Sequence, residues 1–251
     1  MLSVQNISMH FGGIKAVDNV SFSIKTGSIT GLIGPNGAGK TTLFNVIAGL
    51  CEPNAGRIIL DGQDITGSAP HELFHKGMLR TFQLAHEFSS LSVRENLMMV
   101  PPNQSGERLI DTWLSPKKIR AEETANRKRA NDVIAFLQIS HLADEYAGNL
   151  SGGQKKLLEL GRTMMADAKI VLLDEVGAGV NRTLLRQIGD AILRLNKERG
   201  YTFCMIEHDM QFIARLCDPV IVMAQGRVLA TGSAAQVQAN EDVIDAYLGT
   251  G

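Results

Sequence analysis

The sequence predicts an α/β fold, in which a sheet-centred core carries an antiparallel β subdomain and an inserted α-helical subdomain. Three observations predict it. A glycine-rich loop at 34–42 lies between a strand-like run and a helix-like run. The uninterrupted apolar run at 170–173 is typical of a parallel strand that is covered on both faces, and residues 201–206 and 220–223 are expected to be further buried strands. Residues 84–165 have helical patterns instead, which indicates an insertion within one domain and not a separate domain.

Composition limits the possible partners. The chain has 251 residues and a net charge of −1, so its total charge gives no attraction to nucleic acid, and we expect no nucleic-acid partner. The cysteines, Cys51, Cys204 and Cys217, match no metal-ligand spacing, so we expect reduced thiols in a cytosolic core. No signal-peptide pattern opens the chain, and no apolar run has the length of a membrane span. We therefore expect a protein that does not cross a bilayer but can dock on one that does.

The N-terminal part predicts strands and tight turns. Residues 20–24 alternate apolar and polar side chains, as a half-buried strand does. Residues 57–60 form another strand-like run, and Asp61 and Gly62 after it are typical of a hairpin turn. Antiparallel strands are therefore expected before and after the glycine-rich loop.

The middle of the chain predicts helices with recognisable starts. Ser92, with Glu95 three residues later, predicts a capping box. Ser115 followed by Pro116 predicts the first residues of a long helix. That helix mixes both signs of charge, which favours a solvated face over a nucleic-acid site.

Strands and helices alternate again toward the C-terminus, with helices expected over 184–195 and 242–248. No internal repeat or low-complexity linker interrupts the pattern. We therefore predict one domain, with its core and β subdomain in 1–83 and 167–251 and its helical subdomain in 84–166.

The glycine-rich loop has the sequence GPNGAGKTT, which matches the phosphate-binding pattern G-x-x-x-x-G-K-[ST] without a gap. A strand at 28–33 and a helix at 43–48 supply the context that this pattern needs. The glycines let successive N–H groups point inward, and the helix N-terminus adds partial positive charge. Lys40 can then reach the β- and γ-phosphates, and Thr41 offers a hydroxyl to Mg²⁺. The alternative is a glycine-rich turn that matches by accident. The residues predicted to bind phosphate are Gly34, Pro35, Asn36, Gly37, Ala38, Gly39, Lys40, Thr41 and Thr42.

Two carboxylates, Asp174 and Glu175, directly follow the apolar run at 170–173. Ligands bind at the carboxyl ends of strands in open α/β sheets. Asp174 can therefore hold Mg²⁺ through water, and Glu175 can direct a water in line with a γ-phosphate. Carboxylates after a strand are also common as plain turn residues, and the phosphate loop favours the catalytic interpretation.

Residues 150–154 have the sequence LSGGQ and precede an apolar helix. With this motif between the phosphate loop and the carboxylates, the chain resembles the ATP-binding subunit of an ABC transporter over nearly its whole length. The resemblance implies a P-loop NTPase (RecA-like) core. It also implies that the helix N-terminus after the motif binds the nucleotide of a partner subunit through Ser151, Gly152, Gly153 and Gln154.

The resemblance assigns further residues one by one. Gln83 matches the loop glutamine that senses Mg²⁺ and the attacking water, and His208 matches the histidine that contacts the γ-phosphate. Phe11 stands where the family has an aromatic residue that stacks on adenine, and Val17 is expected to pack beside it. The chain departs from the family in two places, with Val176 where a proline is usual and an amide, Asn181, where a carboxylate is usual.

The mechanism implied by the resemblance uses ATP and Mg²⁺ as cofactors. Two ATPase subunits, the same or homologous, close head to tail on ATP, and Glu175 and His208 position an in-line water. The other partners implied are two transmembrane permease subunits and, indirectly, a periplasmic or extracellular substrate-binding protein. The expected location is the cytoplasmic face of the inner or plasma membrane, as a peripheral protein.

Within the family, residues 77–83, 179–181 and 242–249 are similar to those of importers for branched-chain amino acids, a branch that also handles urea and short amides. A lipopolysaccharide-export ATPase and an ABC ATPase that acts on DNA or ribosomes are the alternatives. A binding module without turnover is a third class. The combination of Lys40, Gln83, Asp174, Glu175 and His208 argues against it.

Overall fold

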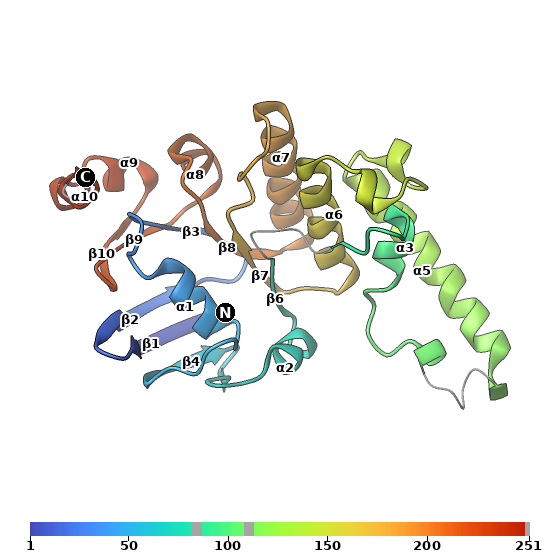
Figure 1. The fold of residues 1–251 in the computed structure, drawn as a ribbon, viewed down its shortest axis with the longest axis horizontal. Coiled ribbons are helices and arrows are strands. Elements are labelled where there is room, and N and C mark those ends of the chain that lie inside the picture. The colour runs from blue at the N-terminus through green and yellow to red at the C-terminus, as the bar shows by residue number, and fades with distance from the viewer. Residues whose placement is uncertain (82–86, 108–112, 249–251) are drawn as a thin grey trace. The chain divides into compact units, whose positions relative to one another are not determined.

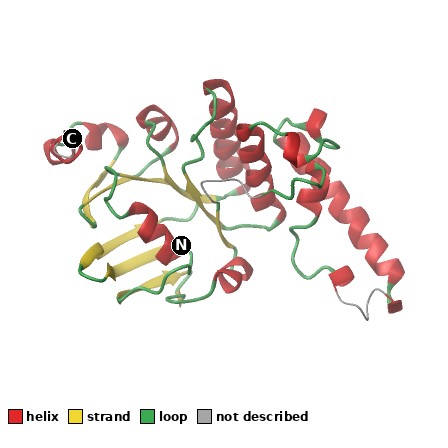
Figure 2. Ribbon diagram, in the orientation of Figure 1, coloured by secondary structure: helices red, strands yellow, loops and turns green. Residues whose placement is uncertain are grey.

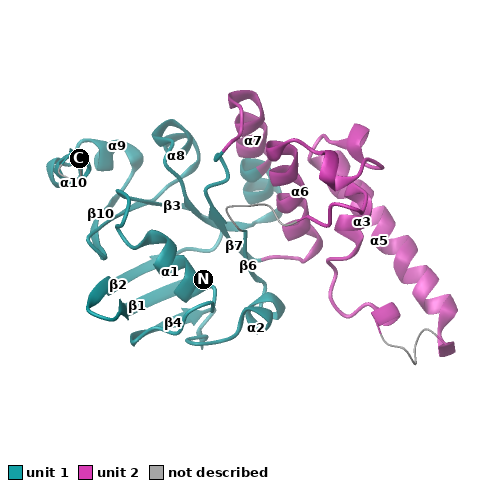
Figure 3. Cartoon of the chain, in the orientation of Figure 1, with its two compact units in different colours: residues 1–83, 169–178, 192–251 teal, residues 84–168, 179–191 magenta. Residues whose placement is uncertain are grey.

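The computed structural model describes residues 1–81, 87–107 and 113–248. The chain divides into two compact units, and each is considered by itself (Figure 3). The first unit contains residues 1–83, 169–178 and 192–251, and the second contains residues 84–168 and 179–191. The segment 179–191 thus groups with the helical unit, whereas the sequence analysis placed it with the core.

An antiparallel sheet of four strands, in the order β2-β1-β4-β5, forms one part of the first unit (Figure 2). Leu2 faces Ile24 on one neighbouring strand and Leu60 on the other. The predicted hairpin after residue 60 is confirmed, because Asp61 and Gly62 both have positive φ angles, as this class of turn requires. The strands are β1 (Leu2–Phe11), β2 (Ile14–Ile24), β4 (Ala55–Leu60) and β5 (Gln63–Asp64).

A second sheet has six strands in the order β10-β9-β3-β8-β7-β6, and all are parallel except β10. Every residue of β3, β7 and β8 is buried, and so are the first four residues of β9, which confirms that the runs predicted at 170–173, 201–206 and 220–223 are buried strands. The strands are β3 (Ile29–Ile33), β6 (Met78–Arg80), β7 (Ile170–Asp174), β8 (Thr202–Ile206), β9 (Val220–Ala224) and β10 (Arg227–Gly232).

Helix α1 (Lys40–Ile47) follows β3 directly and contributes Leu43, Phe44 and Ile47 to a core that also takes side chains from both sheets (Figure 1). The carboxyl ends of β3, β7 and β8 lead into the phosphate loop, Glu175 and His208, so the parallel sheet places these segments at one edge. The other helices of this unit are α2 (Pro70–His75), α8 (Met210–Leu216), α9 (Ala234–Gln238) and α10 (Glu241–Leu248).

The second unit confirms the helical character predicted for 84–165. Gly161 permits its main helices to approach closely, since a Cβ there would lie 2.9 Å from Leu137 and 3.1 Å from Leu97. The elements are α3 (Val93–Met98), η1 (Ser105–Glu107), α5 (Pro116–Phe136), η2 (Ser140–Leu142), η3 (Ala147–Asn149) and α6 (Gly152–Met165). Helix α7 (Arg182–Arg199) contributes residues to both units. Within the described parts of the chain, none of the helices combines the length and apolar character that a membrane span requires.

The two predicted helix caps have different outcomes. Ser92 forms the predicted capping box, in which its Oγ accepts the Glu95 N–H at 3.2 Å and its own N–H donates to Glu95 Oε2 at 2.8 Å. Ser115 is the N-cap residue of α5, as predicted, but its side chain makes no capping hydrogen bond. Pro116 does occupy the first helical turn, where its missing N–H has no cost.

This difference gives a matched test. We expect Ser92→Ala to lower the free energy of unfolding by about 1 kcal/mol, because the first turn of α3 loses a capping acceptor. Ser115→Ala should leave the free energy of unfolding unchanged. Urea unfolding followed by circular dichroism measures both, and equal effects of the two substitutions would contradict the assigned caps.

Candidate functional site

The phosphate loop connects β3 to α1, and its glycines allow close contact between backbone segments. Gly34, Gly37 and Gly39 all have φ angles between +77° and +150°. A Cβ on Gly34 would lie 2.0 Å from the Met223 carbonyl oxygen, and one on Gly39 would lie 2.2 Å from that of Ala16. Both glycines are therefore required sterically, whereas Gly37 needs its freedom only for its left-handed backbone.

Lys40 begins α1 and is buried, with 6% of its surface exposed. Its Nζ donates to the carbonyl oxygens of Gly34 at 2.8 Å and Pro35 at 2.9 Å. Burial lowers the pKa of Lys40, and the carboxylates of Glu175 and Asp174 oppose this shift. The ammonium is therefore held over the loop whose N–H groups would receive a phosphate.

A cavity of about 440 Å³ lies beside the loop, within the size range of small-molecule sites. The cavity brings together the predicted residues Lys40, Thr41, Glu175 and His208. Its full lining is Ile14, Lys15, Ala16, Asn36, Gly37, Ala38, Gly39, Lys40, Thr41, Thr42, Glu175, His208 and Gln225.

The structure does not bring the two predicted adenine contacts to this lining. Phe11 ends β1 and is 52% exposed, and Val17 is fully buried in the core. Ile14, Lys15 and Ala16 line the cavity instead, and the sequence analysis missed them. Their place in the lining depends on how β2 approaches the phosphate loop, which no local pattern indicates.

Glu175 and His208 follow the neighbouring strands β7 and β8, and the structure brings them into contact. His208 Nε2 and Glu175 Oε1 are 2.9 Å apart. Glu175 has a φ of 49°, a left-handed conformation that is uncommon for a residue with a side chain, and its N–H donates to Ile206. Such strained backbone often occurs at functional sites. A carboxylate and an imidazole in this arrangement can orient a water and accept its proton.

Glu207 is a functional candidate that the sequence analysis missed. It is 5% exposed, its Oε1 accepts the Gly177 N–H at 2.7 Å, and its Oε2 accepts the His208 N–H at 3.3 Å. Burial raises the pKa of Glu207; these two N–H groups act against the shift, and the nearby Glu175 carboxylate adds to it. Glu207 thus connects the loop after Glu175 to the residue that carries the imidazole. A charged residue at the end of an apolar run was the only signal in the sequence.

Asp174 ends β7 and is 4% exposed. Its Oδ2 accepts a hydrogen bond from Arg80 Nη2 at 2.7 Å, a contact that the sequence analysis did not anticipate. Thr41 is exposed at the start of α1. Hydroxyl and carboxylate oxygens are ligands that Mg²⁺ accepts. Among the described residues no cluster of three His, Cys, Asp or Glu side chains could hold a metal, so phosphate and water would have to complete such a site. Gln83 lies outside the described residues.

The LSGGQ segment lies in the second unit, where Ser151 precedes α6. Gln154 Oε1 accepts the Ser151 N–H at 2.8 Å. Gly152 is exposed, but Gly153 is buried, and a Cβ there would lie 2.1 Å from Leu184 Cδ2. Only the first of the two glycines therefore has the exposure expected of an anion site, while the second allows the start of α7 to pack. Asn181 Oδ1 caps α7 by accepting the Leu184 N–H at 2.9 Å.

The family described as ABC transporter matches residues 17–178, which is more than half of the chain. The chain belongs to the ABC transporter family. The predicted P-loop NTPase fold is therefore confirmed, and proteins of this family bind a nucleotide and hydrolyse ATP to power transport. The family described as branched-chain amino acid ATP-binding cassette transporter matches residues 227–251 of this ABC ATPase.

Relatives of this ABC ATPase extend over its whole length. The probable branched-chain amino acid transport ATP-binding protein LivG of Archaeoglobus fulgidus is 39% identical over 249 residues, which cover 99% of this chain and 95% of the relative. The high-affinity branched-chain amino acid transport ATP-binding protein LivG of Escherichia coli K12 is 35% identical over 99% of this chain and 98% of its own. A crystal structure of the ADP conformation of an ATP-binding cassette of an ABC transporter is 37% identical, with a TM-score of 0.84 over 99% of this chain and 98% of that chain.

The buried carboxylate of Glu207 predicts a pH effect on stability. The folded-state pKa of Glu207 is raised above 4.5, its ordinary value in an unfolded chain. The contribution of Glu207 to the free energy of unfolding is therefore fully present below pH 4.5, and it is lost as the pH rises through the folded-state pKa. Glu207→Gln keeps an acceptor for Gly177 but cannot ionise. We therefore expect the variant to become more stable than the wild type as the pH increases above 4.5, by about 1.4 kcal/mol for each unit of pKa shift.

Urea unfolding between pH 4 and pH 8 measures this difference. Glu52→Gln, at an exposed loop position, is the control substitution, and its effect on the free energy of unfolding should be small at each pH. A constant difference between Glu207→Gln and the wild type would contradict a raised pKa at Glu207.

Proposed function

We propose that this ABC ATPase energises an importer for branched-chain or other hydrophobic amino acids. The observation that supports the cargo is the combination of relatives named for branched-chain amino acid transport with a match to that branch at residues 227–251. The observation that supports hydrolysis is the contact between Glu175 and His208 at the wall of the cavity beside the phosphate loop.

In the proposed site the loop N–H groups and Lys40 hold the β- and γ-phosphates. Thr41, and Asp174 through a water, would hold Mg²⁺, together with Gln83. When bound, the ion supplies neutralisation of the charge on the phosphates. Glu175 orients the attacking water and takes its proton, and His208 positions Glu175 and contacts the γ-phosphate. Positioning of the reactants and neutralisation of charge account for most of the rate acceleration in phosphoryl transfer.

The catalytic role of Glu175 is open to a direct test. Glu175→Gln should bind ATP normally but hydrolyse it about 10²–10⁴-fold more slowly, because an amide cannot accept the proton of the attacking water. Binding of a fluorescent ATP analogue and phosphate release measure the two steps. Turnover close to that of the wild type would remove Glu175 from the proposed role. Glu241→Gln, which lies outside the cavity lining, should hydrolyse ATP as the wild type does.

We further propose that a second ATPase subunit, a copy of this chain or a homologue, completes the nucleotide site. Ser151 and Gly152 are exposed at the start of α6 and offer a helix N-terminus to an anion. They belong to a different unit from the phosphate loop. Asn181 supplies an amide at the position where the family usually has a carboxylate, and its Oδ1 already accepts a hydrogen bond at the start of α7.

The remaining partners in this proposal are two membrane-spanning permease subunits, with a substrate-binding protein acting through them. The chain would then lie on the cytoplasmic face of the membrane as a peripheral protein. Cargo specificity would reside in the permease and the binding protein, because the ATPase site contacts only nucleotide.

Purification from native membranes tests this assignment. We expect the tagged chain to co-purify with two multi-span proteins, and the ATPase activity of the complex to rise when binding protein loaded with leucine, isoleucine or valine is added. Binding protein without ligand is the control. Exclusive recovery with ribosomes or DNA would contradict an importer. Stimulation by urea or a short amide in place of these amino acids would contradict the proposed cargo.

A further inference from the structure

Arg80, the last residue of β6, holds two acceptors from distant parts of the chain. Its Nη1 donates to Asn45 Oδ1 and its Nη2 to Asp174 Oδ2, the latter at 2.7 Å. Its guanidinium carbon lies 6.0 Å from the centre of the Phe44 ring. The side chains of Arg80 and Asp174 are only 8% and 6% exposed. A buried ion pair is costly to form, and removal of one partner leaves the other charge buried without compensation.

The two acceptors belong to the elements that carry the proposed Mg²⁺ ligands. Asn45 lies one turn after Thr41 on α1, and Asp174 is the last residue of β7. Arg80 therefore connects the helix that carries the hydroxyl ligand to the strand that carries the carboxylate ligand. Because it occupies Oδ2 of Asp174, it leaves the other oxygen of that carboxylate for the ion or its water.

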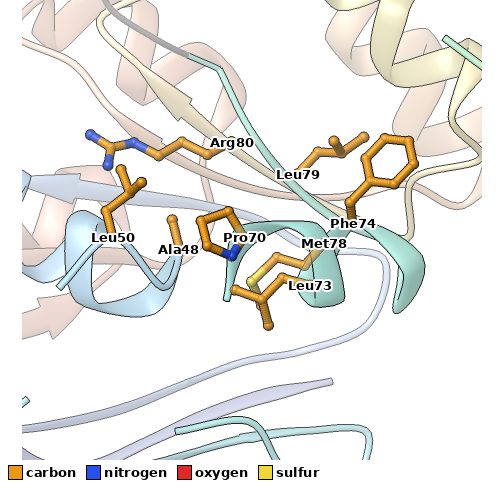
Figure 4. Close-up of a pocket in the computed structure, with 8 residues that line it drawn as sticks. All are labelled: Ala48, Leu50, Pro70, Leu73, Phe74, Met78, Leu79 and Arg80. Atoms are coloured by element: carbon orange, nitrogen blue, oxygen red, sulfur yellow. The ribbon is translucent and has the colours of Figure 1, made fainter. Parts of the chain in front are cut away.

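Arg80 also borders a space that is lined mainly by apolar residues. It lines a small pocket of about 140 Å³, and Figure 4 shows the side chain extended, with its guanidinium directed away from Leu79 and Phe74. The hydrogen bonds to Asn45 and Asp174 set the direction of the guanidinium. The other residues that line the pocket are Ala48, Leu50, Pro70, Leu73, Phe74, Met78 and Leu79.

We propose that Arg80 is a positioning residue for the divalent-cation site, which it serves by orienting the Asp174 carboxylate and holding it against the helix that carries Thr41. This inference rests on the proposed Mg²⁺ site. Partners that hydrogen-bond metal-ligating carboxylates typically change metal affinity by 10–100-fold when they are removed. The guanidinium fork is essential, because a lysine ammonium keeps the charge but does not present two planar donors to two acceptors.

The test measures metal dependence and not only activity. Binding of a fluorescent ATP analogue to the full-length protein is titrated with Mg²⁺, and again in EDTA. Mg²⁺ should enhance binding of the analogue, and we expect Arg80→Lys to raise the Mg²⁺ concentration that gives half of this enhancement by about tenfold or more. Binding of the analogue in EDTA should stay unchanged. Asn45→Ala keeps the Arg80–Asp174 pair and should shift the Mg²⁺ dependence in the same direction by less. It also serves as the second variant if Arg80→Lys does not fold.

Arg94 provides a matched control, because it also binds one asparagine and one aspartate, Asn131 and Asp144, but in the second unit. Arg94→Lys should leave the Mg²⁺ dependence as in the wild type. A wild-type Mg²⁺ dependence in folded Arg80→Lys, or in Asn45→Ala, would overturn the role assigned to Arg80. Wild-type protein whose nucleotide binding does not respond to Mg²⁺ at all would instead overturn the Mg²⁺ site itself.

Discussion

The phosphate loop depends on two close approaches between backbone atoms. Gly34 lies against the Met223 carbonyl at the end of β9, and Gly39 lies against the Ala16 carbonyl on β2, at distances that no Cβ could tolerate. These contacts fix the loop between the parallel and the antiparallel sheet of the first unit. The carbonyls of the same loop then hold Lys40. The glycines thus permit the shape of the loop, and the hydrogen bonds of Lys40 connect its carbonyls to α1.

The contact between Glu175 and His208, the pair proposed to act in hydrolysis, depends on strand order in the parallel sheet. Because β7 and β8 are neighbours, the residues after them meet at the sheet edge, and Glu175 and His208 come into hydrogen-bonding distance. Two buried ionisable side chains, Glu207 and Arg80, contact residues at this edge. Glu207 connects the loop after Glu175 to His208, and Arg80 holds Asp174. A buried ion pair is weak evidence of net stabilisation, which is consistent with the positioning role proposed for Arg80.

The two units contribute different parts of the proposed chemistry. The first unit holds the phosphate loop and the hydrolytic pair, and the second presents the exposed start of α6. In the second unit, Gly152 and Gly153 of the LSGGQ segment have different surroundings. Gly152 leaves the helix start open, whereas Gly153 allows Leu184 of α7 to pack closely. The same motif thus combines the proposed binding position at Gly152 with a packing position at Gly153.

The sequence by itself determined the features that depend on neighbouring residues. These are the phosphate loop, the buried strands β3, β7, β8 and β9, the turn at 61–62, and the Ser92 cap. It missed β6, α2, α8 and α9, which are too short for a periodic pattern. It also assigned Val17 to nucleotide and missed the contacts of Arg80, whose partners are 35 and 94 residues away. Only the tertiary structure decided these, because burial and long-range pairing depend on how distant strands pack together, which local residue order does not encode.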